Sequence, residues 1–245
     1  MMRLRRRQEE SKFFDPAIGS LQVRAWLAGA LLVAAIAAAA LTIDDLVYDL
    51  HARYLLRQDL PALAQLYQAH QYLHQVTVVV PIVALVTVAA WLIWQAQAHA
   101  NLDHLGASGL QFRPASAVAS WFVPVVNLGL PYMAMRELWR ASDPEAGELD
   151  WRERRTTILL PLWWVGLIAS AVLFALGMQL DMRSGGPNGR LITRDLFFIA
   201  SAAMSIATAL LAGLLIKWVD DRQIGKSNRA QSGAWVSWTK RQPAS

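Results

Sequence analysis

The fold is decided by a stretch of 25 residues without a formal charge. Residues 156–180 read TTILLPLWWVGLIASAVLFALGMQL. A helix rises about 1.5 Å per residue and the hydrocarbon core of a bilayer is about 30 Å thick, so this stretch is long enough to cross it. Three further uncharged stretches of about twenty residues each occupy 25–43, 76–94 and 196–216. The sequence therefore predicts an all-α polytopic membrane protein with four transmembrane helices.

Composition agrees with a membrane protein and limits its partners. Hydrophobic residues make up 55% of the 245 residues and charged residues only 17%, a shift toward membrane composition. The net charge of +5 comes from Lys and Arg residues next to the apolar stretches. We therefore expect lipid headgroups, and no nucleic acid, as partners. Because there is no cysteine, disulfides, thiolate catalysis and Cys-ligated metals are excluded.

The distribution of basic residues predicts the orientation in the membrane. Eighteen Lys and Arg residues lie in segments 1–24, 95–155 and 217–245, against five in segments 44–75 and 181–195. The positive-inside rule then places both termini and segment 95–155 in the cytoplasm. The alternative for residues 25–43 is a cleaved signal peptide. The length of this run and the two aspartates that follow it favour an uncleaved first helix.

A further uncharged stretch, residues 115–135, lies between the second and third spans. Pro124 and Pro131 divide it into pieces too short to cross the membrane as one helix, and each proline removes a backbone donor. A crossing here would also place the basic residues that follow it on the outer side. We therefore predict a helix, a break and a second helix, which either re-enters the cytoplasmic leaflet or lies along the interface.

Polar segments flank a predicted membrane domain of residues 21–223. We expect segments 1–20 and 224–245 to be cytoplasmic and the second of them to be disordered. In the outer segment, 44–75, apolar residues recur at helical spacing and predict two amphipathic helices. Small residues on the spans predict close helix contacts. On the fourth span they are Ser201, Ser205, Ala209 and Gly213, and on the third span they are Gly166 and Ser170.

Few residues in this chain point to catalysis. His70 and His74 would share one helix face, but no Glu or Cys accompanies them to complete a metal site. The four predicted spans contain no Asp, Glu, Lys, Arg or His. Ion-coupled transporters usually place such groups at membrane depth, so this function class is disfavoured. We expect no enzyme activity, no cofactor and no metal.

The polar residues with the strongest functional signal lie between the second and third spans. The candidate ligand or motif residues are Asn101, Arg113, Trp121, Pro124, Asn127, Pro131, Arg136, Glu137 and Trp139. Arg136 and Arg140 lie one helical turn apart, a spacing that suits headgroup phosphates. Two interpretations are open. In the first, the asparagines satisfy backbone groups freed by the breaks and the arginines anchor the interface; in the second, these residues line a ligand pocket beneath the break.

Two runs in this region carry a family resemblance. Residues 101–114 read NLDHLGASGLQFRP and residues 121–142 read WFVPVVNLGLPYMAMRELWRAS. They resemble a bacterial family of membrane proteins known as domain of unknown function 4328, with a looser match over residues 25–225. The resemblance implies a multi-span protein of the bacterial inner membrane without an established activity. The chain departs from the family pattern at Gln97 or His99, at Ser120 and at Gly129-Leu130, where the pattern has basic and Trp residues.

Two function classes follow from these observations. The leading hypothesis is a non-catalytic scaffold or accessory subunit that binds other membrane components, which are lipids, other membrane proteins or a second copy of the chain. The alternative is a carrier or channel for a small neutral or lipidic ligand, with Asn127 lining a cavity at the break. A membrane-embedded enzyme would rest on the histidines alone.

Overall fold

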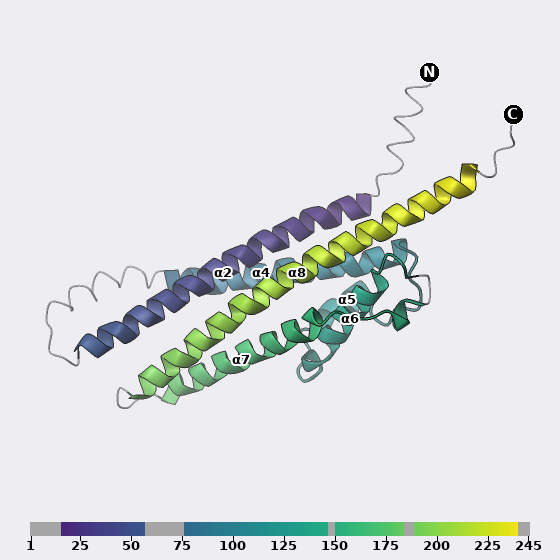
Figure 1. The fold of residues 1–245 in the computed structure, drawn as a ribbon. Helices are drawn as coiled ribbons and strands as arrows, with labels where there is room; N and C mark the ends of the chain where they lie inside the picture. The colour runs from purple at the N-terminus through teal and green to yellow at the C-terminus, as the bar shows by residue number, and fades with distance from the viewer. Residues whose placement is uncertain (1–15, 57–75, 147–149, 184–188, 240–245) are drawn as a thin grey trace, which may run out of the picture. The chain divides into compact units, whose positions relative to one another are not determined.

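The computed structural model is built from helices joined by turns. It describes residues 16–56, 76–146, 150–183 and 189–239. The long helices are α2 (Pro16–Leu56), α4 (Val76–His104), α7 (Leu159–Arg183) and α8 (Gly189–Thr239), and the short ones are α5 (Pro114–Ala119), η2 (Val126–Leu128), α6 (Leu130–Ala141) and η3 (Asp150–Glu153) (Figure 1). The described residues form no strand.

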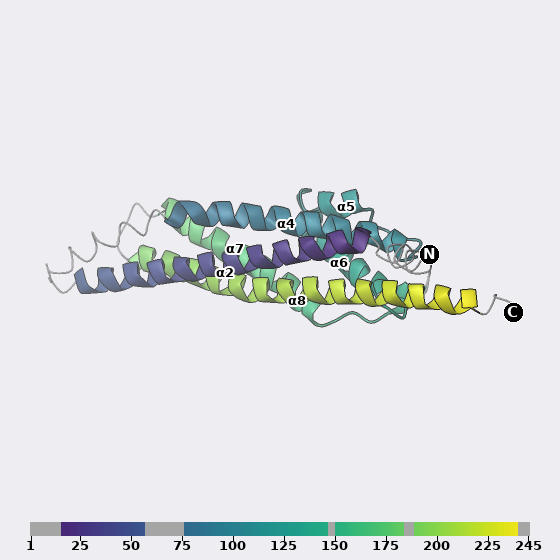
Figure 2. The same cartoon turned by 90° about the horizontal axis from the view of Figure 1, so that it is seen from above.

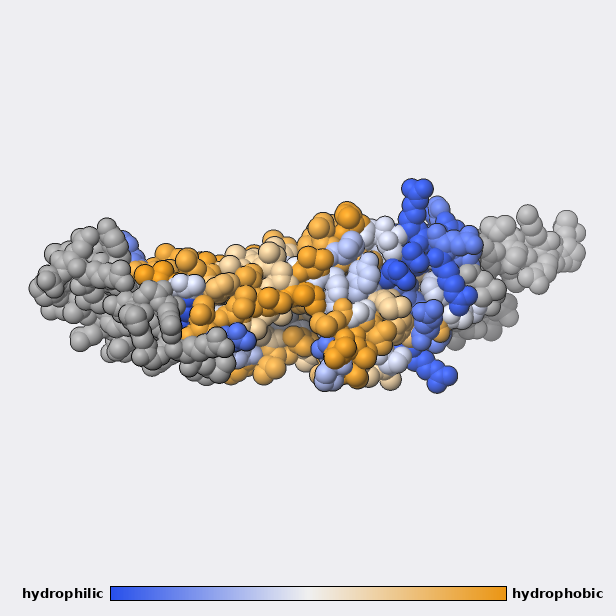
Figure 3. Space-filling model, turned by 90° about the horizontal axis from the view of Figure 1, so that it is seen from below, coloured by the Kyte–Doolittle hydropathy of each residue, from blue (hydrophilic) through white to orange (hydrophobic). Residues whose placement is uncertain are grey.

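Each long helix contains a segment able to cross a membrane. These segments are Leu21–Tyr48, Val79–His104, Leu159–Leu180 and Ile192–Ala230. They expose large apolar side chains such as Leu85 (71% exposed) and Val165 (65% exposed). Figure 3 shows hydrophobic residues, in orange, over much of one face. Exposed apolar surface of this extent is suited to lipid, which solvates it as well as a protein core does. The predicted fold class, an all-α polytopic membrane protein, is confirmed.

Two helices are longer than the sequence predicted. α2 continues without interruption to Leu56, so the first predicted outer helix is an extension of the first span. No Gly or Pro lies between Asp44 and Leu56 to end it. The second predicted outer helix lies in residues 57–75, outside the described part of the chain.

The prediction of a disordered C-terminal segment was wrong as far as Thr239. α8 runs on as one helix from the fourth span to that residue (Figure 2). Adding residues to an existing helix avoids the cost of nucleation, and the segment contains no proline before residue 240. Residues 240–245 lie outside the described part.

The chain forms two compact units, which are considered separately. The span unit consists of the described residues within 29–89 and 161–213. In it, α7 and α8 pack through small residues. The Ser201 hydroxyl donates to the carbonyl oxygen of Ser170 at 2.9 Å. A Cβ placed on Gly166 would lie 2.7 Å from Oγ1 of Thr208, so only glycine permits this approach.

The small-residue face predicted on the fourth span was therefore partly wrong. The predicted pair on the third span, Gly166 and Ser170, does contact α8. On α8 itself Ser201 is buried, but Ser205 is exposed and a Cβ on Gly213 would meet nothing within 4 Å. Helical periodicity of 3.6 explains the error, because steps of four drift off a straight contact line. The contact face runs instead from Ser201 to Thr208.

The motif unit consists of the described residues within 1–28, 90–160 and 214–245. It holds parts of all four long helices, with only the first two residues of α7, together with α5, η2, α6 and η3. Its buried core includes Trp94 and Leu102 from α4, Met135 and Leu138 from α6, and Leu215 from α8. All nine candidate residues lie in this unit, and the site is described within it.

Candidate functional site

Glu137 on α6 holds the loop before α5 in place. Its carboxylate accepts the backbone N–H of Gln111 at 2.7 Å on one oxygen and that of Phe112 at 2.9 Å on the other. The residue is only 5% exposed. Burial raises the pKa of Glu137 above its usual value, while the two N–H groups and the charge of Arg152 act in the opposite direction. Both carboxylate oxygens of Glu137 therefore hold the backbone of the loop before α5.

Asn101 belongs to a chain of hydrogen-bonded amide side chains that is buried at Asn101 and Gln223 and partly buried at Gln97. Its Nδ2 donates to Oε1 of Gln223 on α8 at 3.3 Å, and its Oδ1 accepts Nε2 of Gln97 at 2.9 Å. Gln97 in turn accepts a hydrogen bond from Arg24 on α2 at 2.8 Å. Gln223 also donates to the Ser142 hydroxyl at 3.1 Å. This chain joins α2, α4 and α8 to the residue that follows α6.

Several members of this chain of amides were not predicted from the sequence. Gln97 was noted only as a departure from a family pattern, and Arg24 and Ser142 were not predicted to be site residues. Gln223 was only the last residue of the predicted membrane domain and was not predicted to be a site residue. A single polar residue near a helix end has no periodic signal. Only the fold shows that these side chains face one another.

Two tryptophans of the motif hold other elements of the unit together. Trp121 donates its indole N–H to Oε1 of Gln95 on α4 at 2.9 Å. Trp139 on α6 is 6% exposed, and its ring centroid lies 6.1 Å from that of Trp218 on α8. The guanidinium carbon of Arg222 lies 4.5 Å from the Trp139 centroid, a cation–π contact.

The predicted break between two helices is confirmed. α5 ends at Ala119 and α6 begins at Leu130, with η2 and turns between them. Pro131 is buried in the first turn of α6, where its missing N–H costs nothing, whereas Pro124 is exposed in the break. Val125 has φ +68°, a strained value for a β-branched residue. Asn127 is half-buried, and its backbone N–H donates to the Val123 carbonyl oxygen.

Large apolar side chains are exposed along the break. We call residues 122–128 the apolar loop. Its exposed large apolar side chains are Phe122 (69%), Val123 (47%), Val125 (80%), Val126 (37%) and Leu128 (60%). Such a run of exposed apolar side chains is unusual on a surface that faces water and marks a contact with lipid or protein.

Arg113 lies apart from the other candidates. Its backbone forms the start of α5, since its N–H donates to the Ser116 hydroxyl, which donates back to the Arg113 carbonyl oxygen, each at 2.9 Å. Pro114 follows at the first helical position, which favours the same start. The Arg113 side chain is exposed and lines neither of the two cavities described next.

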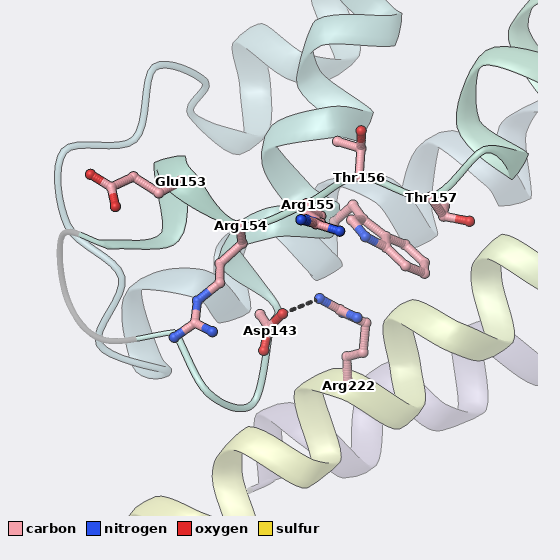
Figure 4. Close-up of a pocket in the computed structure, with 8 residues that line it drawn as sticks. Asp143, Glu153, Arg154, Arg155, Thr156, Thr157 and Arg222 are labelled. Carbon is pink, nitrogen blue, oxygen red and sulfur yellow. Dashed lines mark hydrogen bonds and ion pairs between the residues drawn. The ribbon is translucent and has the colours of Figure 1, made fainter.

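The larger of these two cavities has a volume of about 470 Å³ and an open, charged lining. It is lined by Trp139, Asp143, Glu153, Arg154, Arg155, Thr156, Thr157 and Arg222. Arg222 forms an ion pair of 2.7 Å with Asp143, while the Glu153 side chain points away from this pair (Figure 4). Arg154 pairs with Asp150 at 3.3 Å. Both arginines therefore already have a carboxylate partner.

The smaller cavity has a volume of about 150 Å³ and lies beside α6. It is lined by Gln111, Met133, Arg136, Glu137, Arg140, Trp151 and Arg152. Of the nine candidate residues Arg136 and Glu137 line it, and so does Arg140, which the sequence places one turn from Arg136. Arg152 comes from η3, and its Nη2 donates to the carbonyl oxygen of Gly109. A Cβ on Gly109, which has φ +65°, would lie 2.7 Å from the same Nη2.

Metal ligands do not gather in the described part of the chain. No group of three or more His, Asp or Glu residues there is placed to hold a metal ion. His70 and His74 lie outside the described residues.

Comparison with known proteins gives one match. The family model described as "Domain of unknown function (DUF4328)" matches residues 57–221. No curated protein and no solved structure matches this chain. The match covers α4, α5, α6, α7 and most of α8, and it ends just before Gln223.

Proposed function

The chain belongs to the DUF4328 family, and from that premise we propose that it is a non-catalytic scaffold or accessory subunit of the bacterial inner membrane. In this proposal both termini and the motif unit lie in the cytoplasm, and the motif unit binds another membrane protein. The family description assigns no activity, so the argument rests on what the motif side chains do.

One observation carries the proposal: the motif side chains are engaged in holding the unit together. Glu137 binds two backbone N–H groups, Asn101 binds two glutamines, and Trp121 binds Gln95. A catalytic site needs a nucleophile, acid or base within reach of a substrate. Side chains that are buried and already bonded produce a rigid surface instead. This favours a binding role.

Two surfaces of the motif unit suit different membrane components. The apolar loop suits acyl chains, because its large apolar side chains gain by leaving water. The larger cavity is open and carries charges of both signs with two threonines, so it suits a polar segment of a protein partner. Arg155 is exposed at this cavity and forms no ion pair among the residues that the structure describes.

Photo-crosslinking in native membranes tests the proposal. A photoreactive residue at Arg155 is expected to capture a specific protein, and one at Phe122 is expected to capture lipid. Arg113, exposed in the same unit but outside both cavities, is the control position. If Arg155 captures no protein, including a second copy of the chain, or captures no more than Arg113, the scaffold role is rejected.

The alternative, a carrier with Asn127 lining a cavity, gains no specific support. Asn127 lines neither of the two cavities, and its neighbours in the apolar loop are exposed. We therefore retain the scaffold role as the proposed function.

A further inference from the structure

Three arginines meet around the smaller cavity, and none of them pairs with a carboxylate of the residues that the structure describes. Arg136 and Arg140 come from α6 and Arg152 from η3. Among the described residues, no carboxylate oxygen lies within 4.0 Å of any of the three guanidinium groups. Like charges one helical turn apart destabilise a helix, and a third cation adds to the repulsion. A bound anion would remove this cost.

The one acid in the lining does not balance the three cations. Both oxygens of Glu137 already accept backbone N–H groups, from Gln111 and Phe112. Its carboxylate attracts Arg152 only at longer range. The lining therefore has an excess of positive charge and of unused donors, since each guanidinium carries five N–H groups.

Two of the arginines are held in position before any ligand arrives. Arg140 Nη1 donates to the Arg152 carbonyl oxygen at 3.1 Å, and Arg152 donates to Gly109. The Arg152 guanidinium also lies 5.0 Å from the centroid of Trp151, whose indole N–H is fixed on Ser108 at 2.9 Å. The buried Nε of Arg140 has no hydrogen-bond partner in the described structure. Such fixed donors lose little entropy on binding.

We propose that the smaller cavity binds a phosphate group through Arg136, Arg140 and Arg152. Guanidinium groups match phosphate oxygens with paired N–H donors, which makes arginine the side chain suited to this ligand. The volume of about 150 Å³ accommodates a small headgroup rather than a large soluble cofactor. The phosphate belongs either to an anionic phospholipid or to a free phosphate in solution. The larger cavity does not carry this inference, because two of its three arginines, Arg154 and Arg222, are already paired with carboxylates and leave Arg155 alone.

This inference goes beyond the scaffold role because it needs no protein partner. The test uses the purified full chain in dodecyl maltoside, a detergent without phosphate. Phosphatidylglycerol or inorganic phosphate is titrated in at constant ionic strength, with sodium chloride as the reference. A ligand that binds only the folded protein raises the thermal unfolding midpoint, and the dependence on concentration gives its Kd.

A rise with phosphatidylglycerol alone identifies a lipid headgroup, and a rise with both identifies the phosphate group itself. A rise with neither overturns the proposal. Arg136→Gln is the test variant because the Arg136 side chain lines the cavity and forms no hydrogen bond or ion pair among the described residues, so the substitution breaks none. We expect it to weaken binding about tenfold or more, the scale of one charge-assisted hydrogen bond.

Arg113→Gln is the matched control. It removes the same charge from the same unit, at an exposed side chain outside the cavity. We expect its Kd to equal that of the wild type. If the two variants weaken phosphate binding equally, the phosphate is attracted by the basic surface in general, and the proposed phosphate site is rejected. Photo-crosslinking at Arg155 is read separately, so failure of the scaffold role and failure of this site are distinguishable.

Discussion

The side-chain amide of Gln223 donates to the backbone carbonyl oxygen of Ala98 at 2.9 Å, although 125 positions separate the two residues. Ala98 lies on α4, one turn before Asn101, and both Gln223 and Asn101 are fully buried. A buried side chain with several partners is costly to remove, because each partner loses its hydrogen bond without gaining water. This contact therefore fixes how the last turns of α4 meet α8 at Gln223.

Replacing Gln223 with Ala is expected to destabilise the motif unit. The change removes the hydrogen bond that Gln223 makes with each of Asn101 Nδ2, the Ser142 hydroxyl and the Ala98 carbonyl oxygen. The cost is about 1–3 kcal/mol for each group that finds no water in exchange. The measurement is thermal unfolding of the purified chain in detergent. Asp221→Asn, at an exposed position on the same helix, is expected to change stability by less than about 0.5 kcal/mol. Equal effects of the two variants would contradict the role of Gln223.

Stability is expected to fall as Glu137 ionises. Burial raises the pKa of Glu137, so the folded state favours the protonated form more than the unfolded state does. The resulting contribution of Glu137 to the free energy of unfolding is fully present below the ordinary Glu pKa of about 4.3. It is lost as the pH rises through the raised pKa of the folded state. In Glu137→Gln the site does not titrate. The stability difference between wild type and this variant should therefore shrink from pH 4 to pH 7. A difference that grows over this range would show that the pKa is lowered.

Two glycines in one turn allow a matched comparison. Gly106 and Gly109 both have positive φ, +75° and +65°, but only Gly109 lies against Arg152. Ala at either position is expected to cost about 1–2 kcal/mol through backbone strain. Gly109→Ala should cost about 1 kcal/mol more, because it displaces Arg152 from the Gly109 carbonyl. It should also weaken phosphate binding, whereas Gly106→Ala should not. Unfolding and the phosphate titration measure both effects.

The contact between α7 and α8 predicts opposite outcomes at two other glycines. In Gly166→Ala the new methyl group meets Thr208, whose hydroxyl is fixed on the Met204 carbonyl at 2.8 Å. A loss of about 1–3 kcal/mol is expected from overpacking. Gly213→Ala adds a methyl group where nothing lies within 4 Å, so its stability should be unchanged or slightly higher. If Gly213→Ala lowered the stability more than Gly166→Ala in unfolding measurements, the described contact face between α7 and α8 would be contradicted.

The proposed orientation can be tested by labelling, because the chain has no native cysteine. Asp150→Cys and His51→Cys each introduce one thiol at an exposed position. A membrane-impermeant maleimide should label His51→Cys in intact cells and Asp150→Cys only after permeabilisation. Labelling of Asp150→Cys from outside intact cells would overturn the cytoplasmic placement of the motif unit.

The features predictable from the sequence are those encoded locally. The length of an apolar run is sufficient to identify a span, and Pro124 and Pro131 are sufficient to predict a break. The roles of Glu137 and Arg152 were not predictable, because their partners lie on elements that the fold alone brings together. The helical continuation after Ile224 was missed for another reason. Its polar residues have no apolar period, yet the buried Lys226 donates to the Ala141 carbonyl oxygen there.

The position of Gln223 has a consequence for biosynthesis. Asn101 and Ser142 are synthesised well before Gln223. Until Gln223 has left the ribosome, the Asn101 amide and the Ser142 hydroxyl therefore lack the hydrogen bonds that they make with it. A nascent chain interrupted before residue 223 would contain every predicted span and the whole family match, yet it would present unpaired polar groups inside the motif unit. Quality-control proteases act on such defects, and cells should therefore clear shortened products faster than complete ones.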